Sequence, residues 1–131
     1  MAEAGTGRGG SAAVAPSSSL STARAASVSV KFTQLSSVDG RALAFGSAAT
    51  TPATYGGLTG GTQGPLAETA PVTVANHPGG GGYDATVLQD LSAGYMASLT
   101  AGHHLYACLF NVAPAISGSV PAIVVDFGVL S

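Results

Sequence analysis

The sequence predicts a single all-β domain, an antiparallel β-sandwich or small barrel of jelly-roll or Greek-key type with an extended N-terminal arm. Three observations predict this fold: short runs alternate between apolar and polar residues, Gly- and Pro-rich turns separate them, and helical periodicity is scarce. With 131 residues, 46% of them hydrophobic, the chain is long enough for one hydrophobic core and too short for two ordinary domains.

Residues 1–26 are a low-complexity segment of Ala, Gly, Ser and Thr. Such a segment buries too little apolar surface to offset the entropy lost on ordering. We therefore expect an extended arm over residues 1–26 and a β-sandwich body over residues 27–131. No secretory signal and no apolar run of membrane-spanning length is recognisable, so we expect a soluble chain made in the cytoplasm.

The body is expected to begin with a hairpin. Residues 27–35, SVSVKFTQL, alternate between apolar and polar side chains, as a half-buried strand does. Asp39-Gly40 is a strong turn signal, and residues 42–45 form a short apolar run after it. The sequence therefore predicts a β-hairpin over residues 27–45.

The next stretch alternates between loops and strands. Residues 46–64 contain two Gly-Gly pairs without the Lys-Ser/Thr of a phosphate-binding loop, and we expect a flexible connection there. A strand follows around Val72 and Val74, and it must end before the four glycines at 79–82. Residues 83–91 have some helical spacing, but their β-branched residues favour a strand or one short turn.

Residues 94–112 are the expected centre of the fold. We predict two strands, 95–99 and 103–112, joined by a tight reversal at 100–102. The second strand is apolar on both faces, with Leu105, Ala107 and Leu109 on one and Tyr106, Cys108, Phe110 and Val112 on the other. One face would meet the facing sheet and the other a neighbouring subunit, and either assignment is open.

The last part of the chain is expected to close the sheet. Residues 113–121 contain two prolines and a glycine, which is typical of a linker. Residues 122–130, AIVVDFGVL, are so apolar that we expect a strand in the interior of a sheet. Asp126 then lies either at the wet rim or paired in the interior.

The charge content is the most unusual property of the sequence. Charged residues make up 8% of the chain, against roughly 25% in ordinary soluble domains. A surface so poor in charge favours contact with other protein, although a surface of Ser, Thr and Gly is the alternative explanation. The net charge is −2, and basic residues do not cluster with aromatic ones, so we expect no nucleic-acid binding.

Metal and thiol chemistry have few candidate residues. Cys108 is the only cysteine, so no internal disulfide can form. Because Cys108 lies in the apolar run, we expect a small buried hydrophobe, and a catalytic thiol beside His103 or His104 is the alternative. On a strand His103 and His104 point to opposite faces, so a metal site would need His77 or an aspartate brought in by the fold. We predict no metal site and no cofactor.

Enzyme and sugar-binding sites have equally sparse support. Asp84 with Asp90, or Glu68 with Asp126, would be the carboxylate pairs of a hydrolase. Gly118-Ser119 lacks the G-x-S-x-G frame of a nucleophilic serine, and we predict no catalytic residues and no enzyme. For a carbohydrate-binding sandwich, the aromatic contacts near loops are Tyr55, Tyr83 and Tyr95, for which core or interface roles are the alternative.

A Gly/Ala/Ser arm with scattered Arg, an all-β body with very little charge and no catalytic motif resemble the small virion structural proteins of tailed bacteriophages. Among these, the pattern is most similar to capsid decoration (cement) proteins. The resemblance implies a non-enzymatic virion component, a homotrimer that binds a major capsid or other virion protein and clasps its neighbours through residues 1–26. A head-fibre, tail or small coat subunit is also open, and a carbohydrate-binding module is the alternative class.

Overall fold

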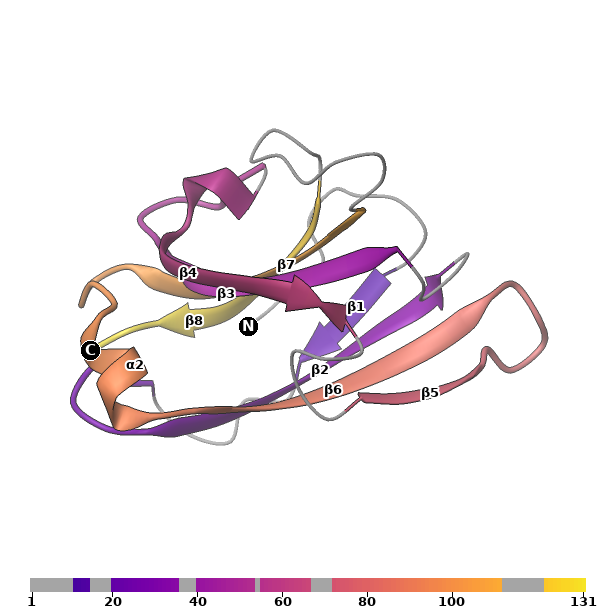
Figure 1. Cartoon of the computed structure of the whole chain (residues 1–131), viewed down its shortest axis with the longest axis horizontal. Coiled ribbons are helices and arrows are strands. Elements are labelled where there is room, and N and C mark those ends of the chain that lie inside the picture. Colours follow the sequence, from indigo (N-terminus) through magenta and orange to yellow (C-terminus); the bar gives the residue numbers. More distant parts are fainter. Residues whose placement is uncertain (1–10, 15–19, 36–39, 54, 67–71, 112–121) are drawn as a thin grey trace.

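The computed structural model describes residues 11–14, 20–35, 40–53, 55–66, 72–111 and 122–131. Two antiparallel four-stranded sheets pack face to face as two layers (Figure 1). The predicted all-β sandwich is thereby confirmed. One sheet has the order β1 (Ser11–Val14), β2 (Ala26–Leu35), β6 (Tyr83–Leu91) and β5 (Val72–Asn76). The other has the order β4 (Thr59–Pro65), β3 (Arg41–Ala48), β7 (His104–Asn111) and β8 (Ala122–Val129).

The strand order has a recognisable topology. The chain crosses between the sheets after β2, β4 and β6, and the hairpins β3–β4, β5–β6 and β7–β8 stay within one sheet. With β4 as the extra strand beside β3, this is the strand order of immunoglobulin-type Greek-key sandwiches. Strand order alone carries no function.

The main core lies between the two sheets. The inner faces of β2 and β6 meet those of β3, β7 and β8, and Phe45 stacks on Phe127 with ring centroids 6.1 Å apart. Every second residue of these strands points inward, which is why the alternation in β2 was informative. The largest fully buried side chains of this core are Phe32, Phe45, Leu35, Leu43, Leu66, Met96, Leu105, Leu109, Ile123 and Leu130.

A second apolar cluster covers the outer face of the sheet that contains β7. Its members are Ala42, Ala44, Ala48, Tyr106, Cys108, Phe110 and Val124, and Leu58 packs against it. Leu105, Ala107 and Leu109 point into the main core instead. Both faces of β7 are therefore buried within a single chain, which resolves the assignment that the sequence left open.

The predicted hairpin over residues 27–45 is wrong, although β2 forms as expected. β2 pairs with β1 and β6, whereas β3 pairs with β4 and β7 in the other sheet. The chain therefore passes from one sheet to the other between β2 and β3. As a result Phe32 and Phe45 enter the same core from opposite layers. Asp39 lies outside the described residues.

The glycine-rich stretch 46–64 is not a loop throughout, since Thr59–Pro65 forms β4 beside β3. Glycines allow these two strands to approach closely. A Cβ at Gly46 would lie 2.7 Å from the Cβ of Leu58 and 3.1 Å from the Cα of Gly61. The glycines made this segment resemble a loop in the sequence. In the fold, their lack of a side chain is what allows β3 and β4 to pack so closely.

The strand predicted over residues 95–99 is also wrong, because Ala93–Ala97 forms the short helix α2. The side chain of Ser92 caps this helix by accepting a hydrogen bond from the backbone N–H of Tyr95. Met96 and Leu99, three residues apart, are both buried in the main core. This spacing suits a helical turn, and β7 begins only at His104.

The last strand forms as predicted but lies at the edge of its sheet, not in the interior. The edge is partly covered because Leu20 forms a parallel bridge with Leu130. Backbone hydrogen bonds join Thr22 N–H to the Ser131 carbonyl and Ser131 N–H to the Leu20 carbonyl, at 3.0 and 3.1 Å. The apolar strand therefore gains at this end a neighbour that the sequence did not suggest.

Parts of the expected arm over residues 1–26 lie against the body. Ser11–Val14 forms β1, which pairs with β2, and Leu20 is buried in the main core. The linker expected at 113–121 falls outside the described residues. In the described part of the chain, no helix has the length and apolar character needed to cross a membrane.

Candidate functional site

The most elaborate polar cluster lies at the β5–β6 hairpin. The connection runs from His77 to Gly82, and Gly79, Gly80, Gly81 and Gly82 all have positive φ angles. At Gly82 the backbone passes so close to β2 that an added Cβ would overlap the carbonyl oxygen of Leu35. Glycine is required there for both reasons, and the hairpin is thereby fixed against the end of β2.

Asp84 is the centre of this cluster. Its carboxylate accepts a hydrogen bond from His77 Nδ1 at 2.8 Å and one from the backbone N–H of Gln34 at 3.2 Å. Lys31 Nζ lies 3.8 Å from the other carboxylate oxygen. Gln34 has a φ of 59° at an irregularity in β2, and this turns its N–H towards the carboxylate. Backbone strain and a buried carboxylate thus occur together.

The donors around Asp84 keep it ionised. Burial of the carboxyl alone would raise its pKa, but the hydrogen bonds from His77 and Gln34 and the charges of His77 and Lys31 outweigh burial. The net effect is a lowered pKa of Asp84. The carboxylate therefore acts as a fixed negative charge that holds the hairpin, the bulge and Lys31 together, and not as a proton donor.

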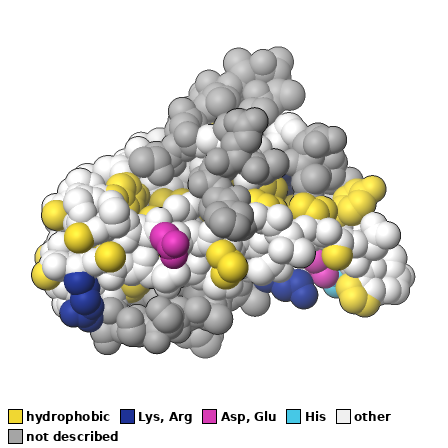
Figure 2. Space-filling view, turned by 60° about the horizontal axis from the view of Figure 1, so that its bottom comes forward, with side chains coloured by type: hydrophobic (Ala, Val, Ile, Leu, Met, Phe, Trp, Pro, Cys, Tyr) yellow, Lys and Arg dark blue, Asp and Glu magenta, His cyan; other side chains and the backbone are white. Residues whose placement is uncertain are grey.

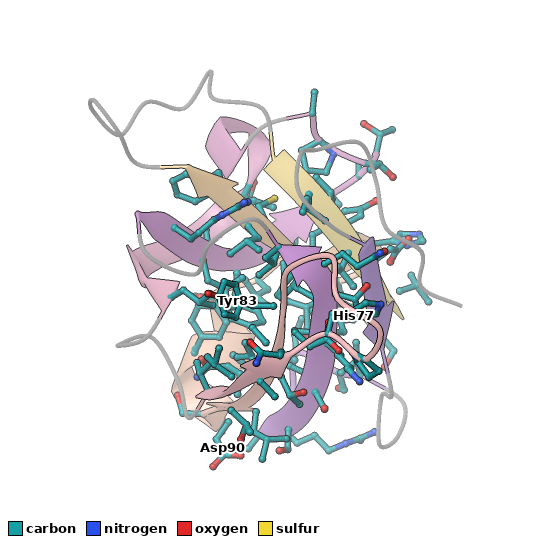
Figure 3. The ribbon with its side chains drawn as sticks, turned by 90° about the vertical axis from the view of Figure 1, so that its right-hand side faces the viewer. His77, Tyr83 and Asp90 are labelled. Atoms are coloured by element: carbon teal, nitrogen blue, oxygen red, sulfur yellow. The ribbon has the colours of Figure 1, made fainter. Side chains whose placement is uncertain are left out.

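Tyr83 does not join this cluster, although it immediately precedes Asp84 in the chain. Neighbouring residues of a strand point to opposite faces, and Figure 3 shows Tyr83 and His77 on either side of the hairpin. The Tyr83 side chain is 42% exposed. Asp90 lies apart from both, near the other end of β6, where it accepts a hydrogen bond from Ser27.

A second His–Asp pair lies on the outer face of the other sheet. His104 Nδ1 is 3.1 and 3.0 Å from the two carboxylate oxygens of Asp126. The backbone N–H of Gly128 also donates to Asp126, at 2.8 Å. The His104 ring stacks on Tyr106, whose hydroxyl shares a hydrogen bond with Thr51. Asp126 is thus half-buried and paired.

The potential metal-ligating side chains of each cluster are one His and one Asp. In the described ranges, no group of three or more His, Cys, Asp or Glu side chains is placed to hold a metal ion. A His–carboxylate pair orients an imidazole, but catalysis needs a nucleophile or substrate group at the other ring nitrogen. The hydroxyl of Thr51 is engaged by Tyr106 and not by His104.

The carboxylate pairs considered from the sequence are not brought together. Asp84 and Asp90 lie six residues apart on β6, which is roughly 20 Å along an extended strand. Asp126 belongs to the opposite sheet from both. Glu68 and Gly118-Ser119 lie outside the described residues.

The remaining candidates have structural surroundings. Cys108 is buried in the second apolar cluster, and burial raises the pKa of its thiol to about 12, so the expected small hydrophobe is confirmed. His103 precedes β7, and its carbonyl accepts a backbone hydrogen bond from Leu130. Tyr95 lies half-buried in α2 against the main core. Tyr55 begins the short helix η1 (Tyr55–Gly57), and its side chain is not among those that the structure describes.

The two His–Asp pairs themselves were missed at the sequence level. His77 and Asp84 lie close only because β5 and β6 form a hairpin, with Asn76 opposite Tyr83. His104 and Asp126 are brought together by the β7–β8 register, in which Tyr106 faces Asp126. A correct strand register would have revealed both pairs.

The surface outside these clusters is nearly neutral. Among the described residues, the exposed charged ones are Arg24, Lys31 and Asp90, while Arg41 and Asp84 are buried. Figure 2 shows the same pattern on one face, where a few charged side chains are scattered among neutral ones. The most exposed large apolar side chains are Val74, Tyr83, Leu88 and Val129.

Comparison with protein-family models, curated proteins and solved structures gives no match to this chain.

Proposed function

We propose that this chain is a non-enzymatic assembly protein, and specifically a virion component that decorates or cements a bacteriophage capsid. The observation that carries the proposal is the nearly neutral surface. Exposed charge in the described part is confined to Arg24, Lys31 and Asp90. A free monomer normally stays dispersed through surface charge, whereas a subunit whose surface contacts other protein does not need it.

The site geometry supports a structural role as well. The buried carboxylate of Asp84 ties β2 to the β5–β6 hairpin, and Asp126 ties β8 to β7 through His104. Both clusters fix the ends of strands. A two-layer body whose described surface carries little charge is suited to packing against a protein lattice.

The fold also narrows which surfaces can make those contacts. The two faces of β7 are covered within the chain, so the apolar centre of the sequence is not an intersubunit surface. The outer faces, the strand edges, the loops and the segment before β1 are the surfaces left for such contacts. By the resemblance, the assembly is a homo-oligomer, with a trimer as the first expectation, attached to a major capsid or other virion protein.

Removing residues 1–10 tests attachment through the arm. This truncation spares β1 and Leu20, whereas removing all of residues 1–26 would take both from the sandwich. The truncated chain should unfold at nearly the same temperature as the full chain but no longer co-sediment with capsid shells assembled from the major capsid protein of the same phage. Circular dichroism and sedimentation measure the two properties.

The matched control is the full chain with Leu88→Ser, which changes an exposed apolar residue on the body and leaves residues 1–10 in place. Retained co-sedimentation of the truncated chain would contradict the role of the arm. A full chain that neither binds shells nor self-associates at any concentration would contradict the assembly proposal as a whole.

A further inference from the structure

β5 is an edge strand whose outer side faces no other strand of the described chain. It is the last strand of its sheet and pairs with β6 through five consecutive residue pairs without a register shift. Figure 1 shows it at the margin of the lower layer, beyond β6. An edge strand presents unpaired N–H and C=O groups, which are a template for another strand.

The hairpin hydrogen bonds show which backbone groups face outward. His77 N–H donates to the Gly82 carbonyl at 2.9 Å, and these residues lie opposite each other in the register of Asn76 with Tyr83. In an antiparallel pair, hydrogen-bonded and non-hydrogen-bonded positions alternate. Thr73 and Ala75 therefore bond to β6, and the N–H and C=O groups of Val72, Val74 and Asn76 point to the free edge.

Within its own five residues, β5 lacks the sequence features that often protect an edge. Its sequence, VTVAN, contains no proline and no charged residue, and its pairing with β6 has no bulge. The other edges differ. β4 contains glycines and a register shift against β3, β1 has only four residues, and the end of β8 is covered by residues 20–22.

We propose that β5 pairs with β5 of a second copy of this chain, antiparallel about a two-fold axis at Val74. In this register Val74 faces Val74 of the other copy, and Val72 faces Asn76. These are the three positions whose backbone groups point outward, so each facing pair exchanges two hydrogen bonds, about six in all. The two sheets then join into one continuous sheet, in the order β1-β2-β6-β5-β5-β6-β2-β1.

The pattern of β5 fits its own copy. A two-fold interface places the same patch against itself, so a charge at position 74 would meet a like charge across the axis. β5 has none, and Val74, 45% exposed, would cover its counterpart across the axis. Thr73 would face Ala75 on the other side of the sheet. Among the described residues of the neighbouring strands, the charges of Lys31 and Asp84 are already paired with each other.

This inference deepens the proposed function by naming the surface through which the subunit self-associates. It rests on that proposal only for the biological use of the pair. Its prediction for the oligomeric state differs from the trimer that the resemblance to decoration proteins implies. Two-fold pairing of β5 gives assemblies with an even number of chains.

The test uses the full chain at increasing concentration. Light scattering should show a rise from one copy of 12.6 kDa to two copies or an even multiple. Amide hydrogen exchange, measured residue by residue, should slow at Val74 by at least tenfold over the same concentration range. The Thr73 amide bonds to β6 in either state, so its exchange should not follow the concentration.

Val74→Lys is the disrupting variant, since it brings two ammonium groups together at the axis, and an edge lysine is a natural block to strand pairing. It should weaken self-association by at least tenfold. Thr73→Lys is the matched control, because the same charge on the neighbouring residue lies on the other face and away from the axis. It should change association less than threefold, and circular dichroism of both variants checks the fold.

An oligomer with an odd number of chains, or one whose Val74 amide exchanges as in the monomer, overturns the β5 pairing and leaves the proposed function standing. A single copy at every concentration, with no binding to capsid shells, overturns both. Equal loss of association in the two lysine variants also contradicts pairing centred on Val74.

Discussion

Asp84 is a buried carboxylate surrounded by donors from three places in the sequence. His77, the backbone of Gln34 and Lys31 belong to the hairpin loop and to β2, and only the fold brings them to one carboxyl. The sequence did single out His77 and Asp84, but for metal binding and hydrolysis. Residue types alone indicate possible chemistry, whereas partners depend on strand register.

Replacing Asp84 with Asn tests this cluster through the pH dependence of stability. Because the pKa of Asp84 is lowered on folding, its ionised form stabilises the fold at pH values above the unfolded pKa of about 4. That contribution is lost as the pH falls through the folded pKa. We expect Asp84→Asn to lower the free energy of unfolding at pH 7, with a difference from the parent protein that shrinks towards pH 2.5.

Urea unfolding at pH 7, 4 and 2.5 measures this difference. Asp90→Asn is the matched control on the same strand, since Asp90 is exposed and its described partner is the Ser27 hydroxyl. A stability difference for Asp84→Asn that stays constant from pH 7 to pH 2.5 would show that the carboxylate is not held by these donors.

The burial of Cys108 could be predicted from its position in the apolar pattern. It lies in a run that is apolar in both registers, and burial follows whichever face it occupies. The reactive alternative needed a base beside the thiol, but the thiol lies among apolar side chains, whose burial of it raises its pKa to about 12. Burial was predictable from the sequence, while the identity of the covering residues was not.

At the scale of elements, strands with alternating or doubly apolar patterns were predictable and glycine-rich ones were not. β2, β5, β7 and β8 occur where the sequence indicates them, and residues 83–91, for which a strand or one short turn was expected, form β6. β4 escapes detection because its glycines serve close packing against Leu58 and β3. α2 escapes because five residues are too few for helical periodicity, and the Ser92 cap was the available signal.

Gly82 and Gly79 allow the cost of backbone strain to be compared with the cost of a steric overlap within one hairpin loop. Both have positive φ, but a Cβ at Gly79 meets open space, whereas one at Gly82 overlaps the Leu35 carbonyl. Gly79→Ala should lower the free energy of unfolding by about 1 kcal/mol from backbone strain alone. Gly82→Ala should lower it by about 3 kcal/mol, because the hairpin must also move away from β2.

Chemical denaturation of the two variants gives both values. Equal losses of stability would mean that the loop shifts without resistance and that Gly82 is not a fixed contact with β2.

At the scale of the whole molecule, the chain builds two apolar cores from a sandwich that usually needs one. The strongly apolar character of β7 predicted burial on both faces, and the fold class followed from the pattern of short strands. The assignment of strands to sheets did not follow. A turn signal between β2 and β3 predicts that the chain reverses direction there. It does not predict whether the next strand joins the same sheet or the opposite one.

Phe110→Ala tests whether the outer cluster belongs to the fold. Phe110 is 1% exposed within the single chain, so truncation should lower the free energy of unfolding by about 3–5 kcal/mol. Leu88→Ala, at a side chain that is 55% exposed, should change it by less than about 0.5 kcal/mol. Urea unfolding below the concentration of self-association measures both variants.

If Phe110→Ala leaves the stability of the monomer unchanged but dissociates an oligomer, then a neighbouring subunit and not the chain itself covers this face of β7.

The parallel pairing of residues 20–22 with Leu130 and Ser131 has a mechanical consequence. Tension applied through Leu20 and through the C-terminal residue pulls the two segments in opposite directions along their length. The hydrogen bonds at Ser131 are then loaded together in shear, and not opened one after another as in an antiparallel hairpin. The join between residues 20–22 and the end of β8 is thus oriented to resist tension that reaches it through Leu20 and Ser131.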